Sequence, residues 1–427
     1  MFKRILIALN VLMLVTACAI PISKNHEIYA AMDRYEAAYH QIIPNDPAAE
    51  DNIDIMAEVL TMVDRRYVDQ VNPEDLIDQA IAGLKESPET GNNEPDPTTR
   101  ALNAMFTSLD RYTGYMEPTS FATYRDSLDG RFVGFGVHIK MVDDQLTVVS
   151  LLKGSSAEDA GIQAGDIITD IDDQPIKGTL TQARSMLRGP EGTVSLLSIL
   201  RGGNPVPLKI NVARRAVELA AVEHQIKGNV GYIRIFSFTA KTGLEVSTAL
   251  RSFEDTLGSN LCGVILDMRN NPGGLVSAAE TVASSVMDGG NIYAVKNRGQ
   301  NMMARDADRG DITKGAPIVV MLNKGSASSS EIVAGALKYQ HRAILFGEQS
   351  YGKGLMQSLM PLHNGGGLRL TTGRFTTGGG PTFHGIGLTP DIPDVTAPEE
   401  SDEIQISRAA ESLHCSVPLT TAMATTQ

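Results

Sequence analysis

The sequence predicts a multidomain, mixed α/β protein with a helical N-terminal region, a small β-rich domain and a larger α/β domain. Three observations support this fold class. The chain has 427 residues, which at roughly 150 residues per domain indicates two to three domains. Hydrophobic residues make up 42% of it, enough for packed cores. Helical spacing of apolar residues early in the chain gives way to short apolar runs between glycine turns, and then to alternating strand-like and helix-like segments.

The start of the chain resembles a secretory signal. Lys3 and Arg4 precede an apolar run that ends at Val15 and is too short to span a bilayer. The following Thr-Ala-Cys is similar to a bacterial lipoprotein box, which implies that Cys18 becomes a lipidated N-terminus on the periplasmic face of a membrane. Ala19 in the next position favours the outer membrane. The alternative is an ordinary signal peptide with a chance cysteine.

Charge and cysteine content exclude several classes of protein. The net charge of −13 argues against nucleic acid as a partner, because binding to phosphates needs a basic surface. Three cysteines are too few for a disulfide scaffold. Neither HExxH nor CxxC occurs, so we expect no metal site and no cofactor. Cys262 lies in an apolar run, where a buried free thiol is the default, and a disulfide with Cys415 is left open.

The N-terminal region is predicted to be helical and to carry no chemistry. Apolar spacing predicts a helix over 53–70, a second that begins at Asn72-Pro73 and runs to about residue 84, and a third over 100–109. Residues 86–99 are rich in Pro, Asn and Glu, which predicts a mobile loop.

Residues 130–214 resemble a PDZ domain. The resemblance is carried in order by VGFGV at 133–137, by SSAEDAGIQAGDIITDIDDQPI at 155–176 and by LRGPEGT at 187–193. A PDZ domain binds a peptide as an added strand and holds its terminal carboxylate with backbone N–H groups. The resemblance implies a substrate-binding role for the loop of Gly134, Phe135 and Gly136. It implies a similar role for one basic side chain, Arg188. Arg188 is the candidate for coupling tail binding to catalysis.

The third domain is predicted to be a layered, partly parallel α/β structure. Apolar runs predict strands at 230–236, 262–268, 318–323 and 342–346. Helices are expected between them, at 242–257, 275–287 and 331–340.

One turn in this domain is a candidate nucleophile site. The strand at 318–323 enters a helix through a small-residue turn, where a serine can be exposed and backbone N–H groups can stabilise an oxyanion. On residue types alone, a serine-rich helix cap is the commoner explanation. Lys353, flanked by glycines, follows Ser328 by 25 residues, and the intervening helix, strand and loop can bring it back to the start of the helix. A P-loop is disfavoured because Gly354 replaces the Ser or Thr that binds magnesium.

Residues 100–400 resemble the carboxy-terminal processing peptidases, also called tail-specific proteases. The motifs occur in the family's order and include ALNAMFTSLD, VILDMRNNPGG, NKGSASSSEIVAGAL, FGEQSYGKGLMQ and TPDI. The resemblance implies an α/β serine-peptidase core of the tail-specific type with a Ser–Lys dyad. By position in these motifs, Ser328 is the nucleophile, Lys353 is the general base and Gln357 orients Lys353.

The oxyanion site is expected at two backbone turns. The resemblance and the Asn-Pro-Gly-Gly sequence imply donors from the N–H of Ser329 and from Gly273 or Gly274. Ser329 itself departs from the alanine common at this position. His341 and His384 fall in no matched catalytic motif, so we expect neither to act as the base.

We therefore predict a serine endopeptidase that recognises unstructured C-terminal tails of envelope proteins. The alternative is a non-catalytic PDZ scaffold that binds such tails. Members of the family often form oligomers and sometimes use lipoprotein adaptors. By resemblance, both are hypotheses for this chain. The predicted boundaries are 1–17 (signal peptide), 18–128 (helical region), 130–214 (PDZ domain), 215–400 (peptidase domain) and 401–427 (C-terminal tail).

Overall fold

The computed structural model describes residues 22–86, 96–176, 179–218, 220–299, 302–394 and 401–417. The chain forms two compact units, the first made of residues 1–117 and 357–372 and the second of residues 118–356 and 373–427. The predicted lipidation site at Cys18 and the segment 87–95 lie outside the described residues.

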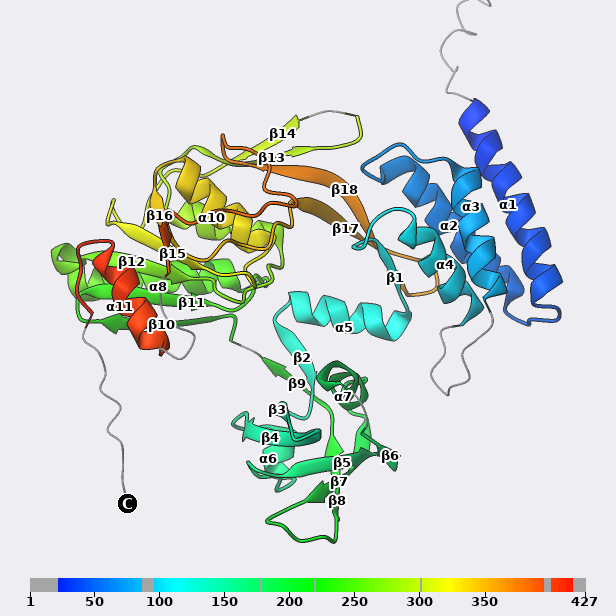
Figure 1. Ribbon diagram of the computed structural model, residues 1–427, viewed down its shortest axis with the longest axis horizontal. Coiled ribbons are helices and arrows are strands. Elements are labelled where there is room, and N and C mark those ends of the chain that lie inside the picture. The colour runs from blue at the N-terminus through cyan, green and yellow to red at the C-terminus, as the bar shows by residue number, and fades with distance from the viewer. Residues whose placement is uncertain are drawn as a thin grey trace, which may run out of the picture. The chain divides into compact units, whose positions relative to one another are not determined.

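The first unit is mainly helical, as the spacing of its apolar residues predicts. Its helices are α1 (Ile22–Ile42), α2 (Ala49–Arg66), α3 (Pro73–Lys85) and α4 (Pro97–Thr107), which lie beside one another in Figure 1. The side chain of Asn72 caps α3 by accepting the N–H of Glu74, and Pro73 occupies the first turn. Helix α2 begins four residues earlier than the predicted 53–70, and α4 begins at Pro97, inside the segment predicted as a loop.

One apolar core holds this unit together. Tyr35 of α1, Met56 of α2 and Ile77 of α3 are fully buried in it. Two late segments return to the same core, because β17 (Leu355–Pro361) and β18 (Gly367–Thr377) contribute buried residues such as Leu368. The short strand β1 (Gly114–Met116) pairs with the start of β18. Residues 357–372 are therefore part of the N-terminal unit, although they are far from it in sequence.

The PDZ region is a small β domain of the second unit, preceded by α5 (Pro118–Leu128). Its sheet has the order β3-β4-β5-β7-β8, with β6 paired to β5, and β2 pairs separately with β9. The bounds of these strands and of the two helices are β2 (Arg131–Gly134), β3 (Val137–Val142), β4 (Gln145–Leu151), α6 (Ser156–Asp159), β5 (Ile167–Ile171), β6 (Gln174–Pro175), α7 (Leu180–Leu187), β7 (Val194–Leu200), β8 (Leu208–Ala213) and β9 (Arg215–Glu218).

A six-stranded sheet forms the centre of the α/β domain. Its order is β10-β11-β12-β15-β16-β19, and all pairs are parallel except β10 with β11. The strands are β10 (Val222–Lys227), β11 (Val230–Ile235), β12 (Gly263–Asp267), β15 (Ile318–Leu322), β16 (Ala343–Gly347) and β19 (Ile392–Pro393). Every residue of β12 and β15 is buried, as expected for parallel strands covered on both faces.

Helices cover both faces of this sheet (Figure 1). Alternate strand residues, among them Ile233 and Leu266, pack against α8 (Thr242–Leu257), α9 (Val276–Ser285) and α10 (Ser329–Tyr339). The intervening residues, among them Ile265, pack against α11 (Asp402–Glu411).

Helix α11 lies in the first part of the segment 401–427, which was predicted as a C-terminal tail. Its buried Ile406, Ala409 and Ala410 cover one face of the sheet. A disulfide joins Cys262, just before β12, to Cys415, just after α11. The sequence left this pairing open, because the local apolar run around Cys262 could not reveal a partner 153 residues away.

A second β layer belongs partly to the second compact unit. Strand β13 (Asn291–Lys296) pairs with β14 (Met302–Asp306) and with residues 374–377 of β18, antiparallel in both cases. Across the described ranges, no helix is both long and apolar enough to cross a membrane.

Candidate active site

The serine turn is the segment between β15 and α10. In it, the hydroxyl of one serine differs from those of the neighbouring serines in its hydrogen bonding. The hydroxyls of four serines are tied down: Ser326 donates to Met268 O, Ser329 to Gly274 O, Ser330 to Asn271 O and Ser350 to Glu331. Within the described ranges, the hydroxyl of Ser328 donates no hydrogen bond. Its side chain is half-buried, whereas those of its neighbours are buried.

Ser328 also has an unusual backbone conformation. Its φ of 56° and ψ of −112° lie in a region that L-residues rarely adopt, and such conformations are concentrated at functional sites. Directly after it, Ser329 starts α10. The first N–H groups of a helix have no acceptor within the helix and form a site for negative charge. The turn therefore places one half-buried serine beside a helix end that can stabilise negative charge.

A glycine turn after β12 lies against this serine. A Cβ built on Gly273 would come within 2.9 Å of Ser328 Cβ and 3.0 Å of Ser329 N. Gly273 (φ 102°) and Gly274 (φ 144°) both have left-handed backbones, which glycine adopts freely. No larger residue fits at 273 without displacing the serine turn.

The backbone carbonyl of Asn271 joins the two turns, and its side chain supports the glycine turn. Asn271 O accepts the N–H of Ala327 at 3.0 Å, and Asn271 Oδ1 accepts the N–H of Gly273 at 2.9 Å. The N–H of Gly273 is therefore engaged. No acceptor is present for the N–H of Gly274 or Ser329 among the residues the structure covers, so Gly274 is the better partner of Ser329 for an oxyanion.

Glu331 connects the serine turn to the segment of Lys353. Its carboxylate is fully buried and accepts four hydrogen bonds. Oε2 accepts the backbone N–H of Ser328 at 2.9 Å and that of Lys353 at 2.8 Å, while Oε1 accepts Ser350 Oγ at 2.6 Å and the N–H of Gly352 at 2.7 Å. One carboxylate oxygen thus holds the backbones of the predicted nucleophile and base. We did not predict this role, although SxxE at a helix start is a capping-box pattern.

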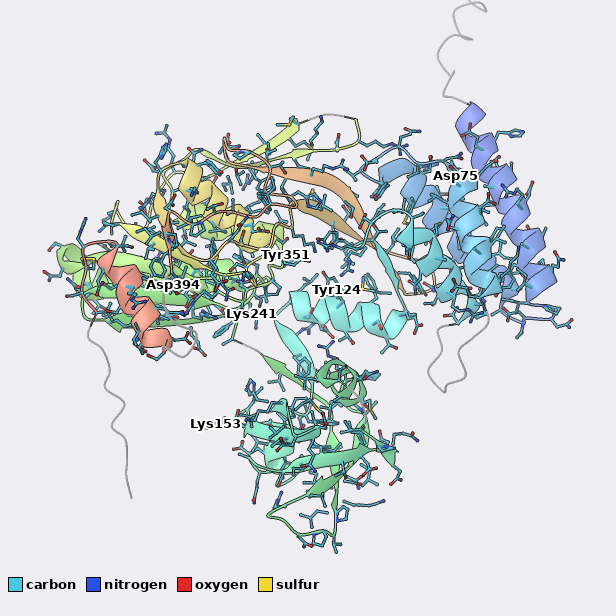
Figure 2. All side chains as sticks on the ribbon, in the orientation of Figure 1. Asp75, Tyr124, Lys153, Lys241, Tyr351 and Asp394 are labelled. Atoms are coloured by element: carbon cyan, nitrogen blue, oxygen red, sulfur yellow. A yellow bond between two sulfur atoms is a disulfide. The ribbon has the colours of Figure 1, made fainter. Side chains whose placement is uncertain are left out.

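Lys353 is held in place from several sides. Tyr351, labelled in Figure 2, donates its N–H to Ser326 O at 3.0 Å, which ties this loop to the serine turn. On the other side of Lys353, a Cβ on Gly354 would lie 2.9 Å from the backbone N of His384. The side chain of Lys353 is half-buried.

Gln357 falls in the other compact unit. Its amide donates to the carbonyl of Tyr112 at 2.9 Å, and its role in orienting Lys353 stays a prediction. His341 lies elsewhere, at the turn after α10, whereas the backbone of His384 adjoins the Lys353 segment.

Comparison with known proteins places the chain in a family. Residues 229–394 match peptidase family S41, and residues 147–201 match the PDZ domain. A carboxy-terminal-processing protease of Bartonella bacilliformis is 41% identical over 295 residues, 68% of either chain. The carboxyl-terminal-processing protease of Synechocystis is 35% identical over 305 residues, 69% of this chain and 70% of that protein. The chain belongs to the carboxy-terminal-processing proteases of family S41.

A solved structure agrees with this assignment. The photosystem II D1 C-terminal processing protease is 27% identical, with a TM-score of 0.50 over 80% of this chain and 92% of that one. The match supports the mixed α/β fold with N-terminal helices, a PDZ domain and an S41 core. Proteases of this family are of the serine type.

In this S41 protease, a buried ionic cluster supports the glycine turn. Asp267, at the end of β12, is fully buried and binds Arg269 at 2.6 Å, Arg234 at 2.5 Å and the hydroxyl of Tyr232 at 2.8 Å. Burial alone would raise the pKa of the Asp267 carboxyl, but the hydrogen bonds and charge of Arg269, with the charge of Arg234, hold that pKa below its usual value. The cluster fixes the start of the turn that carries Gly273 and Gly274.

The PDZ domain of the protease has a cavity of about 270 Å³ beside its first sheet strand. The predicted loop Gly134, Phe135 and Gly136 and the predicted Arg188 all line it, together with Phe132, Val137, His138, Ile139 and Leu187. The structure therefore brings all four predicted PDZ residues to one cavity.

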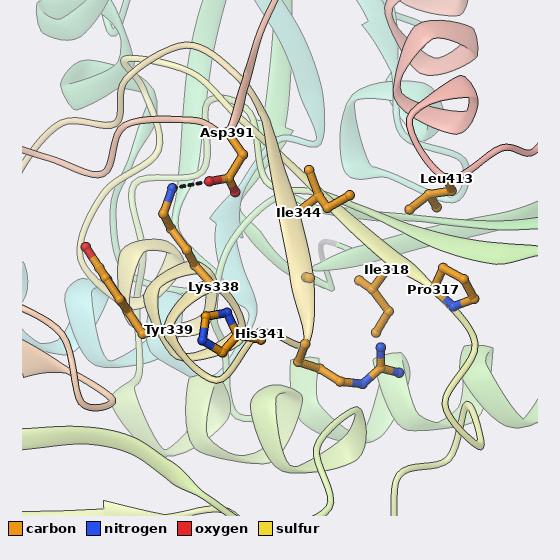
Figure 3. Close-up of a pocket in the computed structure, with 10 residues that line it drawn as sticks. Pro317, Ile318, Lys338, Tyr339, His341, Ile344, Asp391 and Leu413 are labelled. Atoms are coloured by element: carbon orange, nitrogen blue, oxygen red, sulfur yellow. Dashed lines mark hydrogen bonds and ion pairs between the residues drawn. The ribbon is translucent and has the colours of Figure 1, made fainter.

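A larger cavity of about 500 Å³ lies away from these residues. It is bordered by the end of α10, by β16 and by Leu413, and an ion pair between Lys338 and Asp391 crosses its edge at 2.5 Å (Figure 3). His341 lines this cavity, whereas neither Ser328 nor Lys353 does.

Proposed function

We propose that the protein is a serine endopeptidase of the cell envelope, which binds the unstructured C-terminal tails of its substrates and cleaves them with a Ser–Lys dyad. The observation that carries the proposal is the shared carboxylate oxygen of Glu331, which accepts the N–H groups of both Ser328 and Lys353. A scaffold that only binds tails has no use for such an arrangement.

The proposed chemistry follows from the residues in the two turns. Ser328 attacks the carbonyl carbon of the scissile peptide bond, and neutral Lys353 accepts the hydroxyl proton. The N–H groups of Ser329 and Gly274 stabilise the resulting oxyanion. Lys353 then delivers the proton to the leaving amine, and a water molecule releases the acyl group from the serine. Gln357 orients the lysine in this scheme.

Tail recognition belongs to the PDZ cavity in this proposal. The loop of Gly134, Phe135 and Gly136 binds the terminal carboxylate, and the apolar side chains among those that line the cavity accept the last side chain of the substrate. Arg188, which lines the cavity, couples tail binding to the catalytic domain.

The proposed location is the periplasm, with a lipid anchor at Cys18 in the outer membrane. The disulfide between Cys262 and Cys415 supports export, because such bonds persist in oxidising compartments. The multiple acyl chains of a bacterial lipoprotein hold a protein firmly where a single chain does not. Cys18→Ser should release the protein from the membrane fraction; equally strong membrane association would place the anchor elsewhere.

An adaptor lipoprotein and self-association are further hypotheses. Co-purification tests the first and light scattering tests the second.

The central experiment follows cleavage of an unfolded protein substrate. Ser328→Ala should abolish cleavage and keep tail binding, because only the nucleophile is lost. Ser329→Ala is the matched control: it removes a neighbouring hydroxyl that binds Gly274 O but keeps the backbone N–H of residue 329, so most of the activity should remain. Amidating the substrate's C-terminus removes the charge that the loop binds and should slow cleavage. Full activity of Ser328→Ala, or equal cleavage of amidated and free tails, would refute the corresponding part of the proposal.

A further inference from the structure

The first strand of the PDZ sheet has an open edge. Strand β3 pairs with β4 on one side and ends the strand order, and across the described residues no strand pairs with its other side. The cavity of about 270 Å³ adjoins this strand and the end of α7. An open edge beside a cavity lined in part by apolar side chains can accept an extended peptide as an added strand.

The direction of such a peptide is fixed by the loop before β3. Phe135 O accepts the N–H of Ala157, and Gly136 O accepts that of Leu152, which holds the loop. In the described part of the chain, the N–H groups of Phe135 and Gly136 have no acceptor. A terminal carboxylate bound there lies at the start of β3, so the tail runs antiparallel to the strand.

The two faces of β3 differ in chemistry. Val137, Ile139 and Met141 are partly buried against the PDZ core. His138 and Lys140 alternate with them and are exposed. Side chains directly opposite each other in an antiparallel pair point to the same face. When the last residue of the tail lies opposite Val137 with its side chain in the cavity, the penultimate residue lies beside His138 and the fourth from the end beside Lys140.

We propose that the PDZ domain selects tails with an apolar last residue and an acidic fourth-from-last residue, which pairs with Lys140. This inference rests on the proposed function and adds the substrate class to it. His138 contributes a polar contact to the penultimate residue. Arg188 lies 5.7 Å from the ring of Phe132 and adds a second positive charge at the carboxylate end.

The preference for an acidic tail residue depends on the charges near the bound tail and not on the net charge of the chain. The net charge of −13 repels acidic peptides at long range, so only nearby cations can favour them. Lys140 forms no ion pair among the described residues. The acidic residues closest in sequence, Asp143 and Asp144, occupy the hairpin turn beyond β3, opposite the seventh and eighth residues from the end of the tail.

The test measures binding of fluorescent peptides to the full-length protein carrying Ser328→Ala, which prevents cleavage. Three peptides end in the same apolar residue and differ only at the fourth residue from the end, which is Glu, Gln or Lys. We expect the Glu peptide to bind about three- to tenfold more tightly than the Lys peptide at low salt, because opposite charges across strands attract and like charges repel, and this ratio to shrink at high salt.

Charge reversal at one lysine, with a matched control, locates the effect. In the Ser328→Ala background, Lys140→Glu should reverse the order of the three peptides. Lys209→Glu should leave it unchanged, because Lys209 is exposed on β8 at the opposite edge of the same sheet. Equal affinities for all three peptides, or the same change in both variants, would overturn the inference. The proposed function fails differently, by the absence of Ser328-dependent cleavage of any tail.

Discussion

The buried carboxylate of Glu331 accepts a hydrogen bond of 2.8 Å from the backbone N–H of Lys353, 22 residues further along the chain. The same oxygen accepts the N–H of Ser328 at 2.9 Å. The proposed nucleophile and base are thus held by one side chain that takes no part in proton transfer. Glu331 is a positioning residue, because its contacts are to the backbone and to Ser350 rather than to substrate.

Replacement of Glu331 by Gln should therefore impair catalysis while leaving tail binding intact. All four groups around the carboxylate are donors, and the Gln amide has one acceptor oxygen and one donor nitrogen. Two of the four donors would then face another donor. A displacement of about 1 Å at a reacting group costs roughly 100-fold in rate. We expect kcat to fall by about this factor with KM little changed.

A neighbouring glutamate provides the control for this variant. Glu348 is half-exposed and lies 3.8 Å from the exposed Lys324, so Glu348→Gln should have nearly normal kinetics. Thermal unfolding of both variants separates a folding defect from a catalytic one. Wild-type kcat in a folded Glu331→Gln enzyme would contradict the positioning role.

Asp267→Asn should destabilise the peptidase core by about 3–5 kcal/mol at neutral pH, because breaking a buried ion pair leaves uncompensated charge. The affected groups are Arg234 and Arg269, which are largely buried around the carboxylate. Urea unfolding measures the change. Asp402→Asn is the control, because it removes an exposed carboxylate from the same Arg269 and should change stability little.

The low pKa of Asp267 also predicts a pH dependence. Its pKa is lower in the folded than in the unfolded chain, so its contribution to stability is present above the unfolded pKa of about 3.9 and is lost as the pH falls through the folded value. Wild type should lose stability over this acid range, and Asp267→Asn should lose less. Parallel stability curves for the two proteins below pH ~4 would count against the ionic cluster.

The disulfide should stabilise the sheet to which it joins α11. It links residues 153 positions apart, and removing a cross-link over a long loop typically costs about 2–5 kcal/mol. Cys262→Ser with Cys415→Ser should lower the midpoint of thermal unfolding, and reductant should lower that of wild type alone. Titration of thiols in the unfolded, unreduced protein provides the direct check. Two free thiols per chain in protein purified from the oxidising compartment would refute the bond.

Local signals predicted most of the α/β domain. Helix α8 begins and ends where its apolar spacing indicates, at Thr242 and Leu257, and β12 and β15 are recognisable as continuous apolar runs. Helix α8 has a clear apolar periodicity and the two strands are uninterrupted apolar runs, so their local sequences are enough to predict them. The same holds for the cap at Asn72.

Features created by distant contacts were not predictable in this way. Helix α11 is part of the core because Ile406 and its neighbours cover the second face of the sheet. The role of Glu331 depends on Gly352 and Lys353 returning to the start of α10, which no local pattern specifies. The assignment of Gln357 to the N-terminal unit has the same cause, because β17 and β18 leave the peptidase segment and return to it.

The proposed base is tested by changing Lys353 to Arg and to Ala. An ordinary lysine has a pKa of about 10.4, so only about one in a thousand is neutral at neutral pH, and only the neutral amine can accept the proton of Ser328. Arginine stays protonated in proteins. If Lys353 is the base, both variants should therefore be inactive, even though Arg keeps the positive charge.

The pH dependence and one histidine variant complete this test. In wild type, kcat/KM should rise with pH through a single ionisation and then level off, as the amine loses its proton. The matched control is His384→Asn, because the backbone of His384 adjoins Gly354 and a Ser–His mechanism would need its ring. This variant should keep most of the activity. Substantial activity in Lys353→Arg would mean that the lysine supplies only charge, and inactivity of a folded His384→Asn would transfer the role of base to the histidine.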